Sequence, residues 1–274
     1  MRIAIVGKGG SGKSSLSWLF SRFLSEQGYS TLAIDADYNM DLAHNLQVNP
    51  QDYTLLKTAE ADIYKHFNLN LSQNIFDALK NTTVEMFQWN DSFMQKYAQR
   101  INNNLSLMIL GDHDNETLYS GRCSHAYAKA VKFYLPHLKV EPQQVVLIDS
   151  VAGTDMLNYG LYLGVDLIIC VVEDTKNSVG VMHSTQKIAQ ELNIPFIAVQ
   201  NKTLQETAAH ITEATAAQFT FDPALTSYSY KEVNPENEQQ CQKLFSHIFS
   251  TYKMQNTVTR LERWKNMHDS HHTN

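Results

Sequence analysis

Residues 7–14 of the chain read GKGGSGKS and follow directly on a short apolar run at residues 3–6. They satisfy the pattern G-x-x-x-x-G-K-[S/T], and the segment after them, residues 14–27, is predicted to be a helix. A strand, a glycine-rich loop and a helix in this order are typical of a phosphate-binding loop, because backbone N–H groups and the helix N-terminus then point at the phosphates. In such a loop Lys13 reaches the β- and γ-phosphates and the Ser14 hydroxyl binds Mg²⁺. The alternative is a glycine-rich turn without a ligand.

Short runs rich in Val, Ile and Leu recur along the chain, each followed by a helical stretch. Continuous apolar runs are typical of strands that are buried on both faces of a sheet. Strands that alternate with helices predict an α/β fold, with a doubly wound, mostly parallel sheet flanked by helices. The predicted strands are residues 3–6, 31–34, 105–110, 144–148, 167–172 and 196–199.

The length of 274 residues, 43% of them hydrophobic, is enough for one large core. We expect a single domain over residues 1–250, followed by a C-terminal helix or tail over residues 251–274. The alternation of predicted strands and helices is less regular between about residues 50 and 104. We interpret that stretch as a helical excursion packed on the sheet.

Charge and cysteine content indicate the cellular setting. The chain has 22 basic and 28 acidic residues, a net charge of −6 and no basic run, so we expect no nucleic-acid partner. Its three cysteines are too few for a disulfide framework, which favours a reducing compartment. The chain opens without a signal peptide, and no apolar run approaches the roughly 20 residues that span a bilayer. We therefore expect a soluble, cytoplasmic protein without a membrane partner.

Carboxylates follow two of the predicted strands at the point where each strand ends. Residues 35–41 read DADYNMD after the second strand, and Asp149 follows the strand at residues 144–148. Because ligands bind at the carboxyl ends of parallel strands, we expect these side chains to face the phosphate loop. One carboxylate there can orient or deprotonate the attacking water, and another can hold Mg²⁺ through water. For residues 35–41 the alternative is turn formation and helix capping.

A later predicted strand ends in Asn201 and Lys202. An asparagine side chain offers a donor and an acceptor, which suits the edge of a purine ring. We therefore predict that Asn201 binds the base. The pair Asn-Lys also begins a guanine-binding motif, but Leu204 stands where that motif needs an aspartate, so we expect ATP as the nucleotide.

A second lysine, Lys8, lies inside the phosphate loop. With it, residues 8–14 (KGGSGKS) resemble the deviant phosphate loop of the ATPase family that contains nitrogenase iron protein, MinD, ParA and the metal-insertion ATPases. Residues 35–41 resemble the Asp-Ala-Asp-Pro-Asn stretch of the carbon-monoxide-dehydrogenase accessory ATPases, with Tyr38 in place of proline. The resemblance runs from Met1 to about Leu225 and is strongest in the first forty residues.

The resemblance implies a homodimer that closes around ATP and Mg²⁺, with Lys8 touching the nucleotide of the partner subunit. It implies that Asp37 activates the attacking water and that Asp41 and Gly153 sense the γ-phosphate. The implied catalytic residues are Lys8, Lys13 and Asp37, and the implied magnesium site consists of Ser14, Asp37 and Asp149. The implied nucleotide-binding residues are Gly9, Gly10, Ser11, Gly12, Lys13, Ser14, Ser15, Asp41, Gly153, Asn201, Lys202 and Pro223.

Cys123 and His125 stand where the nickel-insertion ATPases carry a Cys-x-Cys pair, which forms a metal site on the dimer axis. Two thiolates and two imidazoles from a dimer are a reasonable ligand set for Zn²⁺ or Ni²⁺. The alternative is a partly buried thiol beside a solvated histidine, and the missing second cysteine speaks against nickel handling. Three histidines in the tail, between residues 268 and 272, could also bind a metal, but a polar tail is the simpler interpretation.

Three functions fit these features. The preferred one is a dimeric, ATP-hydrolysing switch that acts on a client protein, such as a metalloenzyme that is being loaded or reduced. The second is a positioning ATPase of the ParA or MinD kind that acts on a membrane or nucleoid surface. Membrane attachment needs an amphipathic C-terminal helix, and the short apolar trio Val258, Leu261 and Trp264 is expected to pack on the body of the protein instead. The third is a nucleotide-binding regulator without hydrolysis, against which the intact Asp37 speaks.

Overall fold

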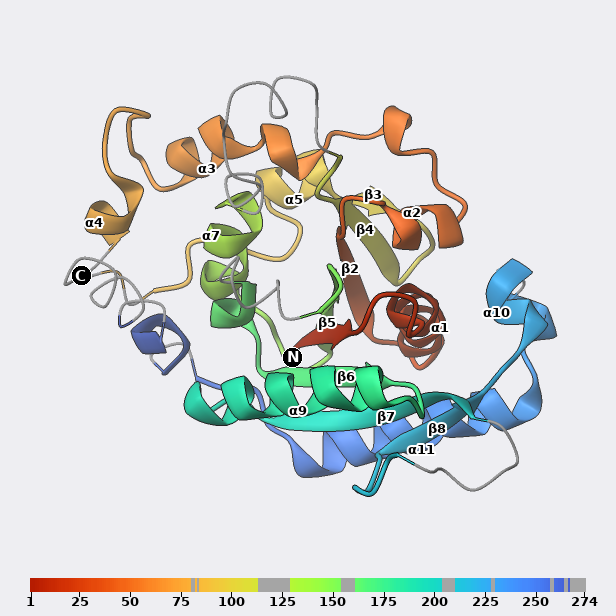
Figure 1. Ribbon diagram of the computed structural model, residues 1–274. Coiled ribbons are helices and arrows are strands. Elements are labelled where there is room, and N and C mark those ends of the chain that lie inside the picture. The colour runs from red at the N-terminus through yellow and green to blue at the C-terminus, as the bar shows by residue number, and fades with distance from the viewer. Residues whose placement is uncertain are drawn as a thin grey trace.

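The computed structural model contains one eight-stranded sheet with the order β3-β4-β2-β5-β1-β6-β7-β8 (Figure 1). Neighbouring strands are parallel, except for the antiparallel pair β3 and β4. The strands are β1 (Arg2–Gly7), β2 (Ser30–Ala36), β3 (Gln99–Arg100), β4 (Leu105–Ile109), β5 (Gln144–Ser150), β6 (Leu167–Val172), β7 (Phe196–Thr203) and β8 (Ala217–Thr220). The predicted doubly wound, mostly parallel sheet is confirmed, and every predicted strand is present. The structure describes residues 1–79, 82, 84–112, 129–153, 161–203, 210–227, 230–256, 259–263 and 266.

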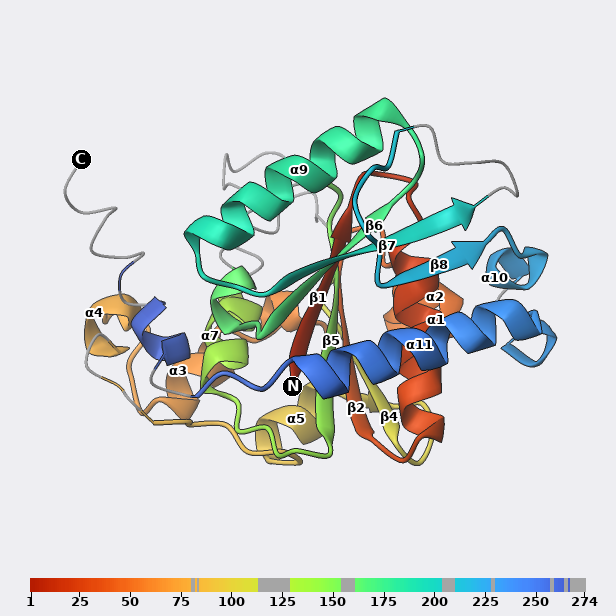
Figure 2. The ribbon, with the colours of Figure 1, turned by 90° about the horizontal axis from the view of Figure 1, so that it is seen from below.

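Helices cover both faces of the sheet, as Figure 2 shows from below. One face packs against α1 (Lys13–Glu26), α2 (Asp41–Asn45), α10 (Pro223–Ser227) and α11 (Pro235–Thr251). The other face packs against α3 (Glu60–His66), α4 (Ile75–Leu79), α5 (Ser92–Tyr97), α7 (Lys129–His137) and α9 (Lys176–Glu191). Short 3-10 turns are η1 (Pro50–Asp52), η2 (Leu56–Thr58), η4 (Leu161–Gly164) and η5 (Tyr230–Glu232). Ile3 and Ile5 of β1 lie in the core beneath α1, α2, α10 and α11, whereas Ala4 lies in the core on the other face of the sheet, because successive side chains of a strand alternate between faces.

Residues 50–104 hold the short helices α3, α4 and α5 and end in β3. Their apolar side chains share one core with the sheet and pack on α7 through aromatic rings. The ring centroids of Phe87 and Tyr134 lie 5.0 Å apart, as do those of Phe93 and Tyr134. The segment therefore extends the core beyond α7.

Strands β3 and β8 were not among the predicted strands. β8 forms one edge of the sheet, where its unpaired backbone groups would face solvent. Side chains of α11 cover this edge: the N–H of Gln218 donates to Gln240 Oε1 and the N–H of Thr220 to Asn237 Oδ1, both at 2.9 Å. The edge strand is thus satisfied by a helix that follows it in the sequence.

The C-terminal segment, in dark blue beside α7 in Figure 2, packs on the body of the protein. Arg260 and Leu261 are each only 1% exposed. The expectation that the apolar trio packs inward is confirmed for Leu261, whereas Val258 and Trp264 lie outside the described residues. In the part of the chain that the structure describes, no helix has the length and apolar character to cross a bilayer.

Candidate nucleotide-binding site

The phosphate loop lies between β1 and α1, which begins at Lys13. The loop closes through a hydrogen bond of 3.1 Å from the N–H of Ser11 to the carbonyl oxygen of Lys8. Lys13 is 6% exposed, residues 14 and 15 are half-buried in the first turn of α1, and Gly10 is exposed at the rim. A buried ammonium at a helix N-terminus, whose first N–H groups have no partner inside the helix, suits a chain of phosphates.

Two positions in the loop accept only glycine. Gly12 has φ 94°, and a Cβ there would lie 2.1 Å from Asn201 Nδ2. Gly7 has φ 148°, and a Cβ there would lie 2.4 Å from the carbonyl oxygen of Val171 in β6. The pattern of glycines therefore reflects the close approach of β6 and β7 to the loop as well as its backbone conformation.

The end of β7 holds the loop from one side. Asn201 Nδ2 donates to the carbonyl oxygen of Ser11 at 2.8 Å, and Lys202 Nζ donates to that of Gly10 at 2.6 Å. Lys202 also forms an ion pair of 2.6 Å with Glu173 Oε1. Asn201, which was predicted at the base, and Lys202, which was predicted to bind the nucleotide, thus lie at the phosphate loop and fix two of its carbonyls. Glu173 was missed, although its place directly after an apolar strand is a signal that could have found it.

Two buried carboxylates lie side by side on the neighbouring strands β2 and β5. Asp35 of β2 and Asp149 of β5 are partners in the parallel register, and both are 0% exposed. Ser17 Oγ donates to Asp149 Oδ1 at 2.9 Å, whereas Asp149 Oδ2 is buried and has no hydrogen-bond partner among the described residues. Burial raises the pKa of Asp149 to about 7, although the hydroxyls of Ser14 and Ser17 lower it. Burial and the neighbouring Asp149 carboxylate hold the pKa of Asp35 well above its usual value.

The free oxygen of Asp149 fits a magnesium site. The hydroxyls of Ser14 and Ser17 on α1 act on the same carboxylate. Mg²⁺ in nucleotide sites takes one or two protein oxygens, phosphate oxygens and several waters. Within the described residues, no group of three or more His, Cys, Asp or Glu side chains could hold a metal ion by itself. Cys123 and His125, predicted at a second metal site, lie outside the described residues.

Asp37 and Asp41 lie on the segment that follows β2. Asp37 is 9% exposed, and its Oδ1 accepts a hydrogen bond of 3.1 Å from the N–H of Asn39. Asp41 begins α2 and is exposed. The segment leaves β2 at the same edge of the sheet at which the phosphate loop leaves β1, so both carboxylates lie at the predicted edge. Their roles in hydrolysis stay predictions.

Gly153 is already engaged in this structure. Its N–H donates to the carbonyl oxygen of Gly7 at 2.9 Å, in an isolated antiparallel bridge. A Cβ at Gly9 would lie 3.6 Å from Ala152 Cβ, so the segment after β5 packs directly on the phosphate loop. The predicted contact between this N–H and a γ-phosphate therefore requires the bond to Gly7 to open.

Pro223 is the first residue of α10 and is separated by two residues from β8, which pairs with the strand that carries Asn201. The preceding Asp222 is 5% exposed and fixes this turn. Its carboxylate accepts the N–H of Ala224 at 2.9 Å and that of Asn234 at 2.8 Å. Pro223 is thus held at the carboxyl edge of the sheet, where the resemblance implied a contact with the nucleotide.

Exchanging Asp149 for asparagine is expected to stabilise the nucleotide-free protein at pH 8 by at least about 1.4 kcal/mol, the value of one pKa unit. The pKa of Asp149, about 7 in the folded state against 3.8 as its ordinary value, lets the folded state bind more protons between those two pH values. Its contribution to stability therefore falls as pH rises through this window. Asparagine carries no charge, so the gain should shrink between pH 8 and pH 5. Urea unfolding of both proteins without Mg²⁺ measures the gain, and equal stabilities at pH 8 would contradict it.

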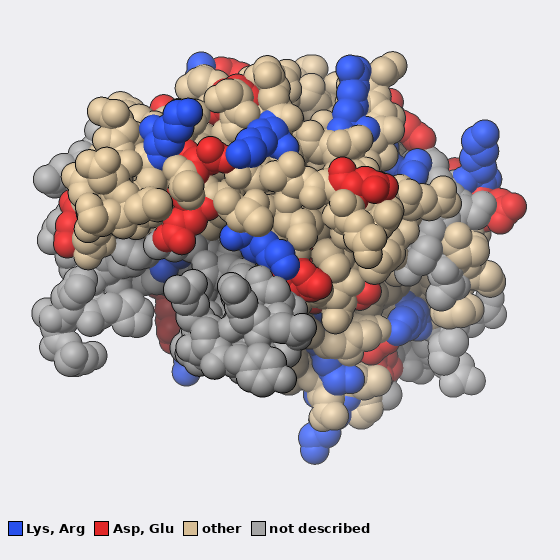
Figure 3. All heavy atoms as spheres, turned by 90° about the horizontal axis from the view of Figure 1, so that it is seen from above, with Lys and Arg blue, Asp and Glu red and all other residues tan. Residues whose placement is uncertain are grey.

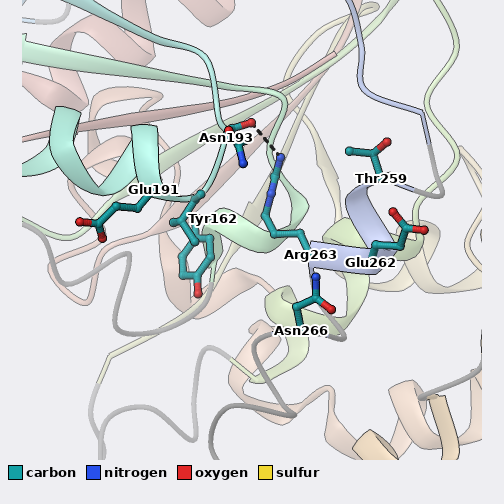
Figure 4. Close-up of a pocket in the computed structure, with 8 residues that line it drawn as sticks. Tyr162, Glu191, Asn193, Thr259, Glu262, Arg263 and Asn266 are labelled. Atoms are coloured by element: carbon teal, nitrogen blue, oxygen red, sulfur yellow. Dashed lines mark hydrogen bonds between the residues drawn. The ribbon is translucent and has the colours of Figure 1, made fainter.

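A hollow of about 470 Å³ lies away from this site, between the C-terminal segment and the end of α9 (Figure 4). Arg263 crosses it and donates to the carbonyl oxygens of Val165 at 3.2 Å and Asn193 at 3.4 Å. Val165 and Asn193 precede β6 and β7, so the hollow lies at the amino ends of the strands. It is therefore not part of the nucleotide site.

The sequence from residue 3 to residue 216 matches the family described as the CobQ/CobB/MinD/ParA nucleotide binding domain. The match includes the phosphate loop, both strands that end in carboxylates, and Asn201. The chain belongs to this family. The predicted membership of the MinD/ParA family is thereby confirmed, and the chain is a nucleotide-binding protein of this ATPase family.

Two relatives match most of the chain. An ATP-binding protein of Methanocaldococcus jannaschii is 26% identical over 219 residues, which are 78% of this chain and 83% of that protein. The carbon monoxide dehydrogenase accessory protein CooC of Rhodospirillum rubrum is 27% identical over 206 residues, 74% of this chain and 74% of that protein.

Solved structures of the MinD/ParA family share the fold. A plasmid partition protein of Borrelia burgdorferi bound to AMPPNP superposes with a TM-score of 0.60 at 15% identity, over 89% of this chain and 96% of that chain. MinD of Pyrococcus horikoshii in complex with Mg-ADP superposes with a TM-score of 0.55 at 14% identity, over 97% of this chain and 96% of that chain. At these identities the likeness shows the fold alone.

Proposed function

We propose that this MinD/ParA family member hydrolyses ATP and works as a dimeric switch. The observation that carries the proposal is the meeting of three strand ends, which bring together Lys13 after β1, Asp149 of β5 and Asp37 after β2. These strands are neighbours in the order β2-β5-β1. One site therefore holds a cation for the phosphates, an oxygen for the metal and a carboxylate for water.

In the proposed reaction water attacks the γ-phosphorus of ATP, the bond from that phosphorus to the β–γ bridging oxygen breaks, and ADP leaves. Lys13 stabilises negative charge on the phosphates, and Ser14 and Asp149 would hold Mg²⁺, which neutralises developing charge when it is bound. The Asp37 carboxylate orients the attacking water and accepts its proton. Phosphoryl transfer needs positioning and charge stabilisation more than covalent chemistry, and the site is composed accordingly.

Asn201 favours adenine in this proposal. One hydrogen of its Nδ2 is bonded to the carbonyl oxygen of Ser11, which leaves the second hydrogen and the acceptor Oδ1. Adenine presents the donor N6 beside the acceptor N7, whereas guanine presents two acceptors on the same edge. Adenine therefore satisfies both remaining atoms of the asparagine, and guanine satisfies one.

Dimerisation rests on Lys8, which is half-buried beside the exposed Gly9. No described residue forms an ion pair with Lys8, in contrast to Lys202. Its ammonium is therefore available to the nucleotide of a second subunit, as the family resemblance implies. A phosphate chain between two such lysines would gain charge stabilisation only in the dimer.

A metalloenzyme is the proposed client. The relative CooC is by name an accessory protein of carbon monoxide dehydrogenase. A site for Ni²⁺ or Zn²⁺ built from Cys123 and His125 of two subunits would serve such a client, and it stays a prediction. Metal content of the ATP-bound dimer, with Cys123→Ser as the comparison, tests it.

The second candidate is a positioning ATPase, since solved neighbours include a plasmid partition protein and MinD. Figure 3 shows one face of the protein, on which the coloured Lys and Arg side chains lie among Asp and Glu side chains without a continuous basic surface. Leu261 of the C-terminal trio is buried. The burial of Leu261 favours a protein client over a membrane surface.

Steady-state release of phosphate tests the hydrolytic function. We expect the wild-type protein to release phosphate from Mg·ATP and, at equal subsaturating concentrations, to act on Mg·GTP about 5- to 150-fold more slowly, since one unsatisfied polar atom at the base costs about 1–3 kcal/mol. The absence of release from ATP would leave a nucleotide-binding regulator, and equal rates would contradict the role of Asn201.

A further inference from the structure

Asp35 is a buried carboxylate that the proposed reaction does not use. It is 0% exposed and lies on β2, where its partner on the neighbouring strand β5 is Asp149. Its two oxygens accept backbone hydrogen bonds from opposite ends of the next segment: Oδ1 from the N–H of Asp37 at 3.2 Å, and Oδ2 from the N–H of Ala43 at 2.9 Å. One side chain thus brackets residues 37–43.

The bracketed segment has a backbone that needs support. Met40 has φ 54°, a left-handed conformation that costs a residue with a side chain about 1–2 kcal/mol. Its N–H donates to the carbonyl oxygen of Asp37 at 3.1 Å, which closes a tight turn. At the far end Leu42 and Ala43 are fully buried. The turn that presents Asp37 is therefore held between the carboxylate of Asp35 and the core.

Asp35 also connects this turn to the metal side of the site. In the register of β2 and β5 its neighbour is Asp149, whose free oxygen fits Mg²⁺. Asp35 therefore sets the position of Asp37 relative to Asp149, through its two backbone hydrogen bonds and through the pairing of β2 with β5. The Asp37 carboxylate, which orients water, therefore has little freedom to move relative to the Asp149 oxygen that would bind the metal.

We propose that Asp35 is a positioning residue for hydrolysis: it holds residues 37–43 so that Asp37 faces the γ-phosphate. This inference rests on the proposed ATPase function. Asp35 is fully buried and acts on Asp37 through the two N–H groups that it binds. Its loss should therefore lower kcat and leave nucleotide affinity nearly unchanged, because misplacing a catalytic group by about 1 Å can cost about 100-fold in rate.

The chain offers a matched control in Asp91. Its carboxylate also brackets a turn with two backbone hydrogen bonds, from the N–H of Met94 at 2.8 Å and from that of Gln88 at 2.9 Å. It lies at the start of α5 in the segment that packs on α7. Asp91→Asn thus removes the same kind of bracket from a place without a role in the reaction.

The experiment compares wild type, Asp35→Asn and Asp91→Asn in kcat, in the Kd for Mg·ATP and in amide hydrogen exchange without nucleotide. For Asp35→Asn we expect a kcat about 10- to 100-fold lower than that of wild type and a Kd for Mg·ATP within about threefold of the wild-type value. Amide hydrogen exchange at Asp37 and Ala43 should be about tenfold faster, since the asparagine side chain can accept only one of the two hydrogen bonds. Asp91→Asn should keep kcat and change exchange only around α5.

Three results would overturn the inference. The first is an unchanged kcat in Asp35→Asn, and the second is an equal loss of kcat in Asp91→Asn. The third needs no variant: in the wild-type protein, the amide of Ala43 exchanges at the rate of an unprotected backbone amide. If the wild-type protein releases no phosphate from ATP, the proposed function fails instead, and exchange alone then decides whether Asp35 holds the segment.

Discussion

Replacing Asp37 with asparagine is expected to lower the rate of ATP hydrolysis by about 100- to 10,000-fold, the usual contribution of a general base. The asparagine oxygen can still accept the N–H of Asn39, which Asp37 Oδ1 binds at 3.1 Å, so the turn keeps its shape. The amide cannot take a proton from water. Phosphate release and the stoichiometry of bound nucleotide, measured on the same sample, separate loss of chemistry from loss of binding.

The control for this variant is Asp52→Asn, which removes an exposed carboxylate on η1. It should hydrolyse ATP at the wild-type rate. If Asp37→Asn retains a rate within about threefold of wild type, water activation by Asp37 is wrong, and catalysis must then rest on Lys13 and the metal alone.

Truncating Arg260 to alanine is expected to reduce the free energy of unfolding by about 1–3 kcal/mol, because the buried carbonyl of Pro136 loses its donor. Glu85 keeps a second cationic partner, since Arg2 NH2 lies 3.8 Å from its Oε1. Arg260 NH2 contacts Glu85 Oε1 at 2.8 Å, and its Nε donates to the carbonyl oxygen of Pro136 at 2.9 Å. Next to this pair, Arg2 NH1 lies 3.5 Å from Asp166 Oδ2. Burial and the nearby Arg260 lower the pKa of Arg2 to about 10, so Arg2 stays charged at neutral pH.

Urea unfolding measures this loss, with Arg100→Ala as the control. Arg100 is exposed, and in the described part of the chain its side chain bonds only to the nearby Asn102 and Asn103. Its truncation should change stability by no more than about 0.5 kcal/mol. An equally small effect at Arg260 would mean that the C-terminal segment contributes little to the fold and can detach, which would revive the possibility of a membrane-binding tail.

The parallel core of the fold could be predicted because its strands are buried on both faces and so read as unbroken apolar runs. β8 could not, since its sequence AQFT alternates and its edge is completed by Gln240 and Asn237 of α11. The place of the C-terminal segment was equally hidden, because Arg260 and Glu85 are 175 positions apart in the sequence.

The site divides in the same way. The phosphate loop is local in sequence, so its residues could be predicted from the motif alone. The contacts of Lys202 with Glu173 and of Asn201 with Ser11 depend on strand order, which the sequence did not supply. Ser17 could have been found, because it lies one helical turn after Ser14 on the face of α1 that meets Asp149.

The most direct test of the proposed switch is the mass of the Asp37→Asn protein by light scattering, with saturating Mg·ATP and with Mg·ADP. Because this variant should bind ATP without hydrolysing it, we expect a particle of twice the chain mass of 31.2 kDa with ATP and a particle of 31.2 kDa with ADP. A particle of 31.2 kDa with ATP, in a sample with one nucleotide bound per chain, would contradict an ATP-driven dimer.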